Sequence, residues 1–401
     1  MHDTSRYFGG QFALMGGCGT NARPPPGRGD PPKLQFDSSP QFRDVSEIHR
    51  RRRHRRPAPA PAPRPRFHRL LAGLVTTGLA IVVALALGFR YGTESMWWLE
   101  IARYVPFPVY LVPALLLVAC AWQLGAAWRV AALLAPLIVA TELMGLAVGS
   151  PDEGSGHLRF MTYNIKAYLA KRTPDGFAKL AWEIASQDPD VIVMQDSQSI
   201  ESADELPLPM QAALKGRQIY VQDQYIIASR YPLSRCAPGN MSYSGDEDNF
   251  AHCTLTVGGR EIDLFTAHFV SPRDGLNAAR GKAAGGLHEW ETNFQDRLAQ
   301  SIQLSAAVSR ATRPVIVAGD LNADERSPVV RRLLATGLRD AFSSAAVGYG
   351  YTLGHDLRPG FSFLRIDHVL VSQDIGVLDC APGGRDGSEH RPVLADLLVA
   401  R

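Results

Sequence analysis

Val315-Ile316-Val317-Ala318-Gly319-Asp320-Leu321-Asn322 joins a short, continuous apolar run to two polar side chains. A run of this length that ends at turn residues is typical of a strand buried on both faces. Asp320 follows the run directly, and Asn322, two positions on, can face the same side. Polar groups at the end of such a strand lie at a sheet edge, where loops form pockets. Because Asx residues also cap turns after strands, this segment predicts a site only together with others.

Four more segments end an apolar run with polar groups of the kinds that bind metals or phosphate. A cation held by oxygen ligands neutralises an anionic phosphate ester. Positioned amide and imidazole groups then stabilise the charge that develops during the reaction. The five segments together predict one metal-assisted site that cleaves phosphate esters. The four are Thr162-Tyr163-Asn164-Ile165, Gln195-Asp196, Thr266-Ala267-His268, and Asp367-His368 with Ser388-Glu389-His390.

The carboxyl-terminal half alternates between strand-like and helix-like patterns, which indicates an α/β domain. Thr173-Pro174 predicts a helix start, since Thr caps helices and Pro suits the first helical position. The Gly- and Ala-rich segment 277–292 is expected to be a loop near the site. Strands are predicted at 158–164, 191–194, 224–229, 253–257, 261–267, 315–318, 368–371 and 393–398, and a helix at 294–311.

The chain from about His157 to Ala400 resembles the endonuclease/exonuclease/phosphatase superfamily. The matching pieces, in order, are MTYNI, DPDVIVMQD, IIASRYPL, TAHFVSP, GDLNA, RIDHVLVS and SEHRPV. The superfamily includes deoxyribonucleases, abasic-site endonucleases, neutral sphingomyelinases and inositol-polyphosphate phosphatases. The resemblance implies an α/β fold, a two-sheet sandwich flanked by helices in four layers, with the site at one end. The leader before this domain is similar to that of the membrane-anchored bacterial branch.

The resemblance also implies a divalent-metal site, with Asp196 as a ligand and Asn164 and Glu389 nearby. Oxygen and amide ligands suit Mg²⁺ or Mn²⁺ rather than zinc. This sequence has Asp196 where the family has Glu, and Glu389 where the family has Asp. Each change moves a carboxylate by roughly 1.5 Å along an extended side chain. The two changes can compensate by letting the ion shift, or they can weaken metal binding, so an inactive domain is an alternative.

Five further residues are implied to be catalytic. One carboxylate would orient or activate the attacking water, and the amide would hold that carboxylate and a phosphate oxygen. One imidazole would contact the phosphate or protonate the leaving group. The other would be the base or transition-state stabiliser, with its tautomer fixed by the second carboxylate. In that order they are Asp320, Asn322, His268, His390 and Asp367. His368 points to the opposite face of its strand and is interpreted as structural.

The five cysteines include no C-x-x-C pair, which argues against a thiolate zinc site. Cys236 and Cys253 would form a bridge in an oxidising compartment, and two free buried thiols are the alternative. The net charge of +3 is unevenly spread, because residues 151–401 carry 25 basic and 31 acidic side chains, a balance of −6. This half lacks the broad basic surface that duplex DNA binding uses, which disfavours a nuclease.

Residues 1–66 are rich in Pro, Gly and Arg and predict a disordered basic leader. Within the region 67–150, transmembrane helices are predicted at 70–89, 106–127 and 130–149, since about 20 apolar residues span the ~30 Å core of a bilayer. Glu142 is the one charge in the third predicted span.

The Arg-rich run at 49–56 precedes the first predicted span and favours a cytoplasmic amino terminus. Three spans then place the catalytic domain, 156–401, in the periplasm of a bacterium, whose inner membrane would hold this multi-pass protein. Two spans would leave it in the cytoplasm.

The sequence thus predicts a membrane-tethered, Mg²⁺- or Mn²⁺-dependent phosphoesterase that uses in-line attack of water. A lipid head group, a nucleotide and a nucleic acid all fit as substrate. The alternative from another class is a non-catalytic membrane receptor for phosphorylated ligands.

Overall fold

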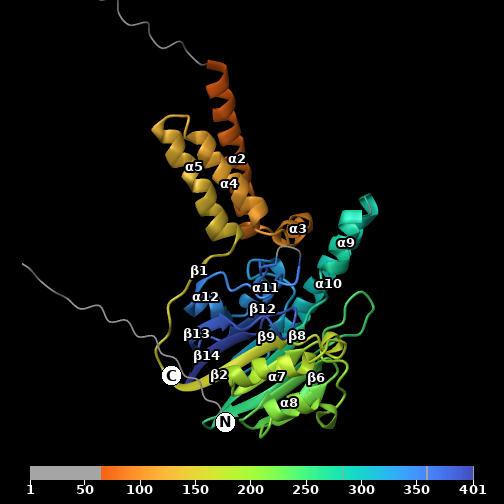
Figure 1. The fold of residues 1–401 in the computed structure, drawn as a ribbon. Coiled ribbons are helices and arrows are strands. Elements are labelled where there is room, and N and C mark those ends of the chain that lie inside the picture. The colour runs from red at the N-terminus through yellow and green to blue at the C-terminus, as the bar shows by residue number, and fades with distance from the viewer. Residues whose placement is uncertain (1–64, 282, 358–359, 401) are drawn as a thin grey trace, which may run out of the picture. The chain divides into compact units, whose positions relative to one another are not determined.

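Two six-stranded mixed sheets form the centre of the α/β domain (Figure 1). The computed structural model describes residues 65–281, 283–357 and 360–400, so the predicted leader lies almost entirely outside the described residues. One sheet has the order β10-β12-β9-β8-β7-β6 and the other β13-β14-β2-β3-β5-β4. Their strands are β2 (Ser155–Asn164), β3 (Val191–Gln195), β4 (Gln218–Gln222), β5 (Tyr225–Ser229), β6 (Leu233–Asn240), β7 (Asn249–Val257), β8 (Arg260–His268), β9 (Val315–Asp320), β10 (Arg339–Asp340), β12 (Asp367–Val371), β13 (Gly376–Pro382) and β14 (Val393–Ala400).

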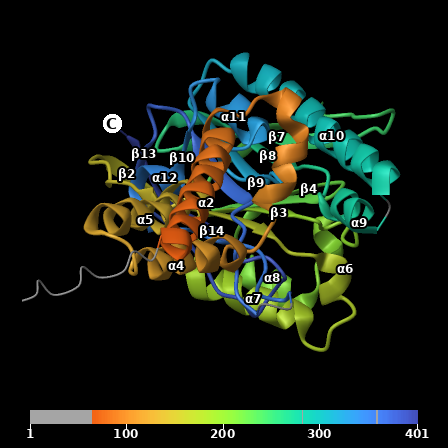
Figure 2. The ribbon, with the colours of Figure 1, turned by 90° about the horizontal axis from the view of Figure 1, so that it is seen from above.

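Helices cover the outer face of each sheet (Figure 2). On one side, α7 (Gly176–Gln187) and α8 (Leu208–Ala213) pack against the sheet that contains β2. On the other side, α10 (Ala283–Ser309) and α11 (Pro328–Leu334) pack against the sheet that contains β9. Apolar side chains of both sheets fill the core between them. The predicted two-sheet sandwich flanked by helices is confirmed. The shorter helices are α6 (Ala167–Ala170), η3 (Ala203–Glu205), α9 (Arg273–Gly281) and α12 (Ala341–Ala345).

Strand registers bring polar residues to one end of the sandwich. β8 and β9 run parallel, and His268 is paired with Asp320. β12 runs antiparallel to β9, and its first residue, Asp367, is also paired with Asp320. In the other sheet, β2 and β3 run parallel and end with Asn164 beside Gln195. Segments that are far apart in the sequence therefore deliver their polar ends to the same place.

Two local predictions were wrong. The described residues of the segment 277–292 are helical, because 277–281 form the end of α9 and 283–292 form the start of α10. A Cβ at Gly286 would lie 2.0 Å from the carbonyl oxygen of Ala278, so glycine here permits close packing of the two helices. Buried Trp290 anchors α10 in the domain, and such tertiary packing overrides weak helix propensity. The helix after Thr173 begins only at Gly176, whose N–H donates to the carbonyl of Thr173 in a turn.

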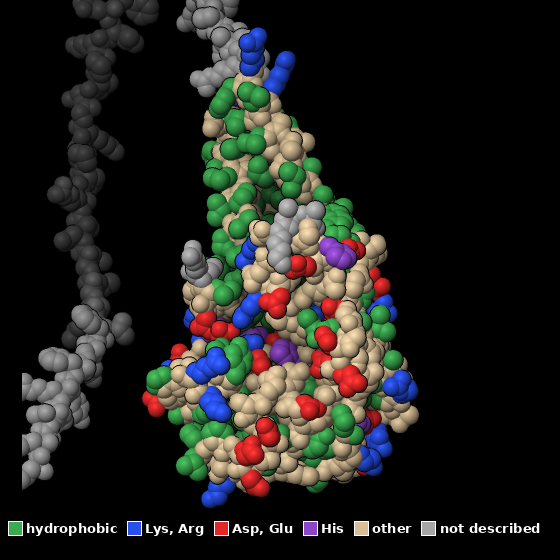
Figure 3. Space-filling model, turned by 90° about the vertical axis from the view of Figure 1, so that its right-hand side faces the viewer, with side chains coloured by type: hydrophobic (Ala, Val, Ile, Leu, Met, Phe, Trp, Pro, Cys, Tyr) green, Lys and Arg blue, Asp and Glu red, His purple; other side chains and the backbone are tan. Residues whose placement is uncertain are grey.

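Among the described residues, two helices are long and apolar enough to cross a membrane. They are Arg66–Tyr91, within α2 (Pro65–Tyr91), and Ala126–Leu143, formed by α5 (Ala126–Ile138) and η2 (Val139–Leu143). Three such spans result if the bent pair Glu94–Arg103 and Pro108–Ala121, which meet at 78°, counts as one. Hydrophobic side chains cover much of the surface of this helical part, whereas charged side chains are spread over the α/β domain (Figure 3).

The predicted spans differ from these helices at their ends. The first, 70–89, lies inside α2. The second, 106–127, is not one continuous helix, because α4 (Pro108–Ala121) ends before a turn at 122–125. The third, 130–149, ends early, because β1 (Ala147–Val148) follows η2 and pairs with β11 (Val347–Gly348). Hydrophobic composition alone therefore overestimated the length of the last two spans.

The connector between α2 and α4 packs into the α/β domain (Figure 1). It consists of η1 (Glu94–Leu99), α3 (Glu100–Arg103) and the residues up to 107. The buried guanidinium of Arg103 donates to Glu100 at 2.7 Å and to Asp324 at 3.1 Å. The indole N–H of Trp290 on α10 donates to the carbonyl of Trp97 at 3.0 Å. The connector is therefore bonded to the same loop and helix that surround the end of β9.

Asp340 holds a buried charged cluster together, and its removal is expected to destabilise the domain. Its carboxylate contacts Nδ1 of His368 at 2.7 Å and accepts from Arg365 at 2.8 Å, which agrees with the structural interpretation of His368. Asp340→Ala removes the buried acceptor that Arg365 and His368 share and leaves Glu325 as the carboxylate that faces Arg365, which should cost roughly 3–5 kcal/mol of unfolding free energy. Denaturation of the detergent-solubilised chain measures this loss. The exposed control Asp204→Ala should change stability by less than about 0.5 kcal/mol, and equal effects of the two variants would contradict the assignment.

Candidate active site

Gly319 allows the two strands that carry Asp320 and His268 to lie very close together. Its φ is +154°, a backbone region that favours glycine. A Cβ at this position would lie 1.9 Å from the carbonyl oxygen of Ala267 on β8. The missing side chain therefore brings the ends of β8 and β9 into contact, with the imidazole and the carboxylate on neighbouring positions.

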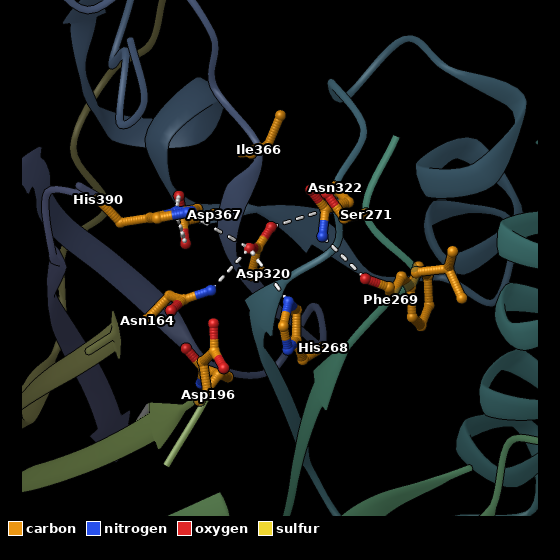
Figure 4. A network of polar contacts seen from close by, with 12 residues as sticks. Asn164, Asp196, His268, Phe269, Ser271, Asp320, Asn322, Ile366, Asp367 and His390 are labelled. Carbon is orange, nitrogen blue, oxygen red and sulfur yellow. Dashed lines mark hydrogen bonds and ion pairs between the residues drawn. The ribbon is translucent and has the colours of Figure 1, made fainter. Parts of the chain in front are cut away.

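The buried carboxylate of Asp320 is the centre of a polar network (Figure 4). Its Oδ2 accepts from Nδ2 of Asn164 at 2.9 Å, and its Oδ1 accepts from the backbone N–H of Asn322 at 3.0 Å. Nε2 of His268 lies 3.6 Å from Oδ2, and Nε2 of His390 lies 3.8 Å from it. Both sheets contribute, because Asn164 ends a strand of the opposite sheet. The carboxylate thus has partners from several separate segments, as a buried charge requires.

Asp367 orients His390. Nδ1 of the imidazole lies 3.0 Å and 3.2 Å from the two carboxylate oxygens of Asp367, so Nδ1 donates and Nε2 faces Asp320. Burial lowers the pKa of His390, but the carboxylates of Asp367 and Asp320 outweigh burial and raise that pKa above its usual value. The raised pKa favours the positively charged form of the imidazole, which suits an anionic ligand beside the centre of the network.

His268 is held from both its ring and its backbone. Nδ1 lies 2.6 Å from Oε1 of Gln224, so Nε2 is left to face Asp320. Its backbone N–H donates to the hydroxyl of Tyr225 at 3.0 Å. Gln224 was predicted only as part of a strand, and nothing in the strand pattern indicated its contact with the histidine.

Residues outside the predicted site fix the loop that carries Asn322. The carbonyl of Asn322 accepts from the hydroxyl of Tyr104 at 2.7 Å and from Arg297 at 3.0 Å. Its side-chain N–H₂ donates to the carbonyl of Phe269 at 2.8 Å. The backbone φ of Asn322 is +48°, a left-handed value that these bonds hold in place. Tyr104 lies in the connector, and no local sequence signal could have joined it to the site.

Asp196 and Glu389, both expected near the metal, each face a cation of the chain. Nζ of Lys166 lies 2.8 Å from Oδ2 of Asp196, and the backbone N–H of Lys166 donates to Oδ1 of Asn164 at 3.2 Å. Burial lowers the pKa of Lys166, but Asp196 outweighs burial and raises it. Glu389 is partly exposed and lies 3.3 Å from Arg273. The structure therefore gathers six of the other seven predicted residues around Asp320, and the carboxylate of Glu389 is turned to Arg273.

The donor groups fit a hard divalent cation. Ligand atoms of Asp320, Asp367 and His390 all lie within 4.8 Å of one another, and all three residues are buried. Asn164 and Asp196 lie next to this group, below Asp320 in Figure 4. The buried carboxylates of Asp196, Asp320 and Asp367 lie in one site, and the ammonium of Lys166 contacts that of Asp196. Further positive charge would therefore stabilise the site. Carboxylate and amide oxygens are the ligands that Mg²⁺ and Mn²⁺ prefer.

The fold and the site define a class of enzyme that the comparisons also identify. Residues 161–390 match the model of the Endonuclease/Exonuclease/phosphatase family, and this match covers more than half of the chain. The chain belongs to this family. Enzymes of the family are hydrolases of the phosphatase and nuclease type. Among curated proteins no sequence matches significantly.

Several solved structures are similar to this chain. A mannosyl-6-phosphatase of Bacteroides thetaiotaomicron has 17% identity and a TM-score of 0.46, and the match covers 60% of this chain and 99% of that one. A truncated TDP2 of Caenorhabditis elegans has 18% identity and a TM-score of 0.46, with coverage of 62% and 100%. A humanized TDP2 of D. rerio has 18% identity and a TM-score of 0.47, with coverage of 61% and 99%. At these identities the likeness concerns the fold alone.

The contact between Asp367 and His390 predicts how the imidazole titrates. In chelator-treated full-length protein, the pKa of His390 should lie above the usual value of about 6.5. Asp367→Asn removes a carboxylate that raises this pKa, so the midpoint should fall. Nitrogen NMR of histidine-labelled protein measures the midpoint and the protonated ring nitrogen. Asp204→Asn serves as a distant control that leaves it in place, and an unchanged midpoint in Asp367→Asn would contradict the proposed contact.

Proposed function

We propose that this chain is a membrane-tethered, divalent-metal-dependent hydrolase of phosphate esters. The observation that carries the proposal is the buried carboxylate of Asp320, which meets an amide and two imidazoles from separate strands and loops. Hydrolysis of a phosphate ester needs a group that orients water, donors for the phosphoryl oxygens and a proton for the leaving alcohol. The proposed catalytic residues are His268, Asp320, Asn322, Asp367 and His390.

We propose a part for each residue, supported by its contacts. Asp320 orients the attacking water and takes its proton, since its carboxylate lies between the two imidazoles. His390, whose protonated form Asp367 favours, stabilises charge on the phosphoryl oxygens. His268 contacts the phosphate or protonates the leaving oxygen. The backbone N–H of Asn322 fixes Asp320. Water attacks in line, its oxygen bonds to phosphorus, the ester P–O bond breaks, and the products are an alcohol and a phosphate.

Asn164, Asp196 and Glu389 are the proposed metal ligands, and Mg²⁺ or Mn²⁺ is the proposed ion. Such an ion, when bound, polarises the phosphoryl oxygen and neutralises its charge. Asp196 supports this role because its carboxylate is buried next to Asn164. To serve as ligands, Asp196 and Glu389 must each exchange a cationic partner of the chain, Lys166 and Arg273.

The ion pair between Lys166 and Asp196 also favours a second candidate function. An ammonium at 2.8 Å already neutralises the carboxylate that would hold the ion. If the metal cannot displace it, the same network of imidazoles and amides would bind a phosphorylated ligand without cleaving it. The chain would then be a membrane receptor, and turnover decides between the two functions.

The proposed location is a bacterial inner membrane with the catalytic domain in the periplasm. Support comes from the apolar helices Arg66–Tyr91 and Ala126–Leu143 together with the bent pair Glu94–Arg103 and Pro108–Ala121, which supplies the third crossing that this topology requires. Further support comes from the bridge between Cys236 and Cys253, which joins neighbouring strands β6 and β7. Disulfides persist in oxidising compartments such as the periplasm. The domain charge of −6 disfavours DNA as the substrate.

Hydrolysis of bis(p-nitrophenyl) phosphate tests the proposed activity. The purified full-length chain should release nitrophenol with Mg²⁺ or Mn²⁺, and a chelator should abolish the release. Asp320→Ala and His390→Ala should each lower kcat by about 10²–10⁴-fold, because each removes a group that handles a proton or phosphoryl charge. Asp204→Ala is the matched carboxylate control. Turnover that persists in both site variants defeats the assignment, and ligand binding without any turnover supports the receptor.

Reporter fusions test the proposed location. Alkaline phosphatase, which is active only where disulfides form, should be active when fused after the last residue of the chain. The same reporter fused in the turn at 122–125 should be inactive. α4 leads from the connector to this turn and α5 leads back from it, so the turn lies on the opposite side of the membrane from the α/β domain. Activity is measured in intact bacterial cells. The reverse pattern would place the catalytic domain in the cytoplasm.

A further inference from the structure

A cavity of about 590 Å³ lies beside Asp320, and its wall is polar in one part and apolar in another. One part is polar and includes Asp320, Asn322 and His390, the cationic side chains of Lys166, Arg273 and Arg280, and the acidic side chains of Asp356 and Glu389. The other part is apolar, and this volume is typical of a ligand-binding cleft. The apolar side chains are Pro106, Leu276, Leu353, Leu357, Phe363 and Leu364.

The membrane connector forms part of this wall. Tyr104 and Pro106 line the cavity, and Pro106 lies two positions before the start of α4 at Pro108. The next residue, Phe107, stacks on Tyr351 at 6.1 Å between ring centroids and packs against Phe361 at 5.0 Å. The apolar wall is therefore continuous with aromatic side chains at the base of α4.

The chain path places this connector at the membrane surface on the side of the catalytic domain. α2 ends at Tyr91 and α4 begins at Pro108, so the carboxyl end of α2 and the amino end of α4 both meet the connector. η2 ends at Leu143, and its Glu142 contacts Arg326 of the α/β domain at 3.3 Å. A bilayer that α2 crosses would have its head groups at the end of α2, next to the connector. Tyr104 and Pro106 of that connector line the cavity.

We propose that the substrate is a phosphate ester of a membrane lipid, taken from the bilayer to which the chain is anchored. This inference rests on the proposed function. The phosphate would lie at Asp320 and His390, near the cationic side chains, and the acyl-bearing part would lie along Leu276, Leu353 and Phe363. Water adds to phosphorus, the ester P–O bond breaks, and the leaving alcohol takes a proton. A fully soluble, polar ester would leave the apolar wall in contact with water.

The test compares lipids with their deacylated counterparts. The full-length chain is reconstituted in phosphatidylcholine vesicles that contain phosphatidylglycerol or phosphatidic acid, with Mg²⁺ or Mn²⁺. The same protein is given glycerophosphocholine, glycerophosphoglycerol and glycerol 3-phosphate. At least one lipid should be hydrolysed with a kcat/KM at least ~10-fold above that of its deacylated form, because burial of a few methylene groups supplies this factor. Mass spectrometry of both products gives the rates.

Variants of two leucines connect the effect to the cavity. Leu276→Gln should raise KM for the lipid several-fold with a smaller effect on kcat, because it makes the apolar wall polar. Leu208, which is 79% exposed on α8, provides the matched control Leu208→Gln, with no effect on lipid KM. Equal or faster hydrolysis of the deacylated esters overturns the inference, as does faster nicking of plasmid DNA. If bis(p-nitrophenyl) phosphate and every ester remain intact, the proposed function itself has failed.

Discussion

The buried carboxylate of Asp320 is the constraint on which the arrangement of the site depends. A charge that is removed from water is tolerated only when donors surround it, and here the donors come from different parts of the fold. Asn164 reaches it from the opposite sheet, which requires the two sheets to meet closely at this end. Gly319 lets the neighbouring strand approach, so that His268 lies next to the same carboxylate. The polar network around Asp320 can therefore form only when the two sheets pack closely at this end.

The sequence predicted what continuous apolar runs and their polar ends encode. The strands that carry Asn164, His268 and Asp320 were found because buried strands have a strong local pattern. Helix α9 and the start of α10 were missed, because Gly and Ala give a weak helix signal and tertiary packing of Trp290 supplies the stability. The contact of Tyr104 with Asn322 could not be predicted either. It joins residues 218 positions apart, and only the three-dimensional fold brings them together.

The connector makes the helical part of the chain a component of the site. Tyr104 and Arg297 share the carbonyl of Asn322, and Arg297 lies over the rings of Tyr104 and Trp290 at 5.5 Å and 5.3 Å. The left-handed backbone of Asn322 is thus held by a tyrosine that belongs to no part of the family match. Isolation of residues 156–401 would remove this support, so the catalytic domain and its helices are best regarded as one functional unit.

Asp196 and Glu389, which differ from the family pattern in side-chain length, each contact a cation of the chain. The shorter side chain of Asp196 meets the ammonium of Lys166, and the longer side chain of Glu389 reaches Arg273 outside the network. Each carboxylate is thereby neutralised within the chain. The proposed divalent ion would have to compete with Lys166 for Asp196. Ligand atoms of Asp320, Asp367 and His390 lie within 4.8 Å of one another. The two exchanged side chains therefore bear on the proposed metal ligands through the cations that they contact, and not through side-chain length alone.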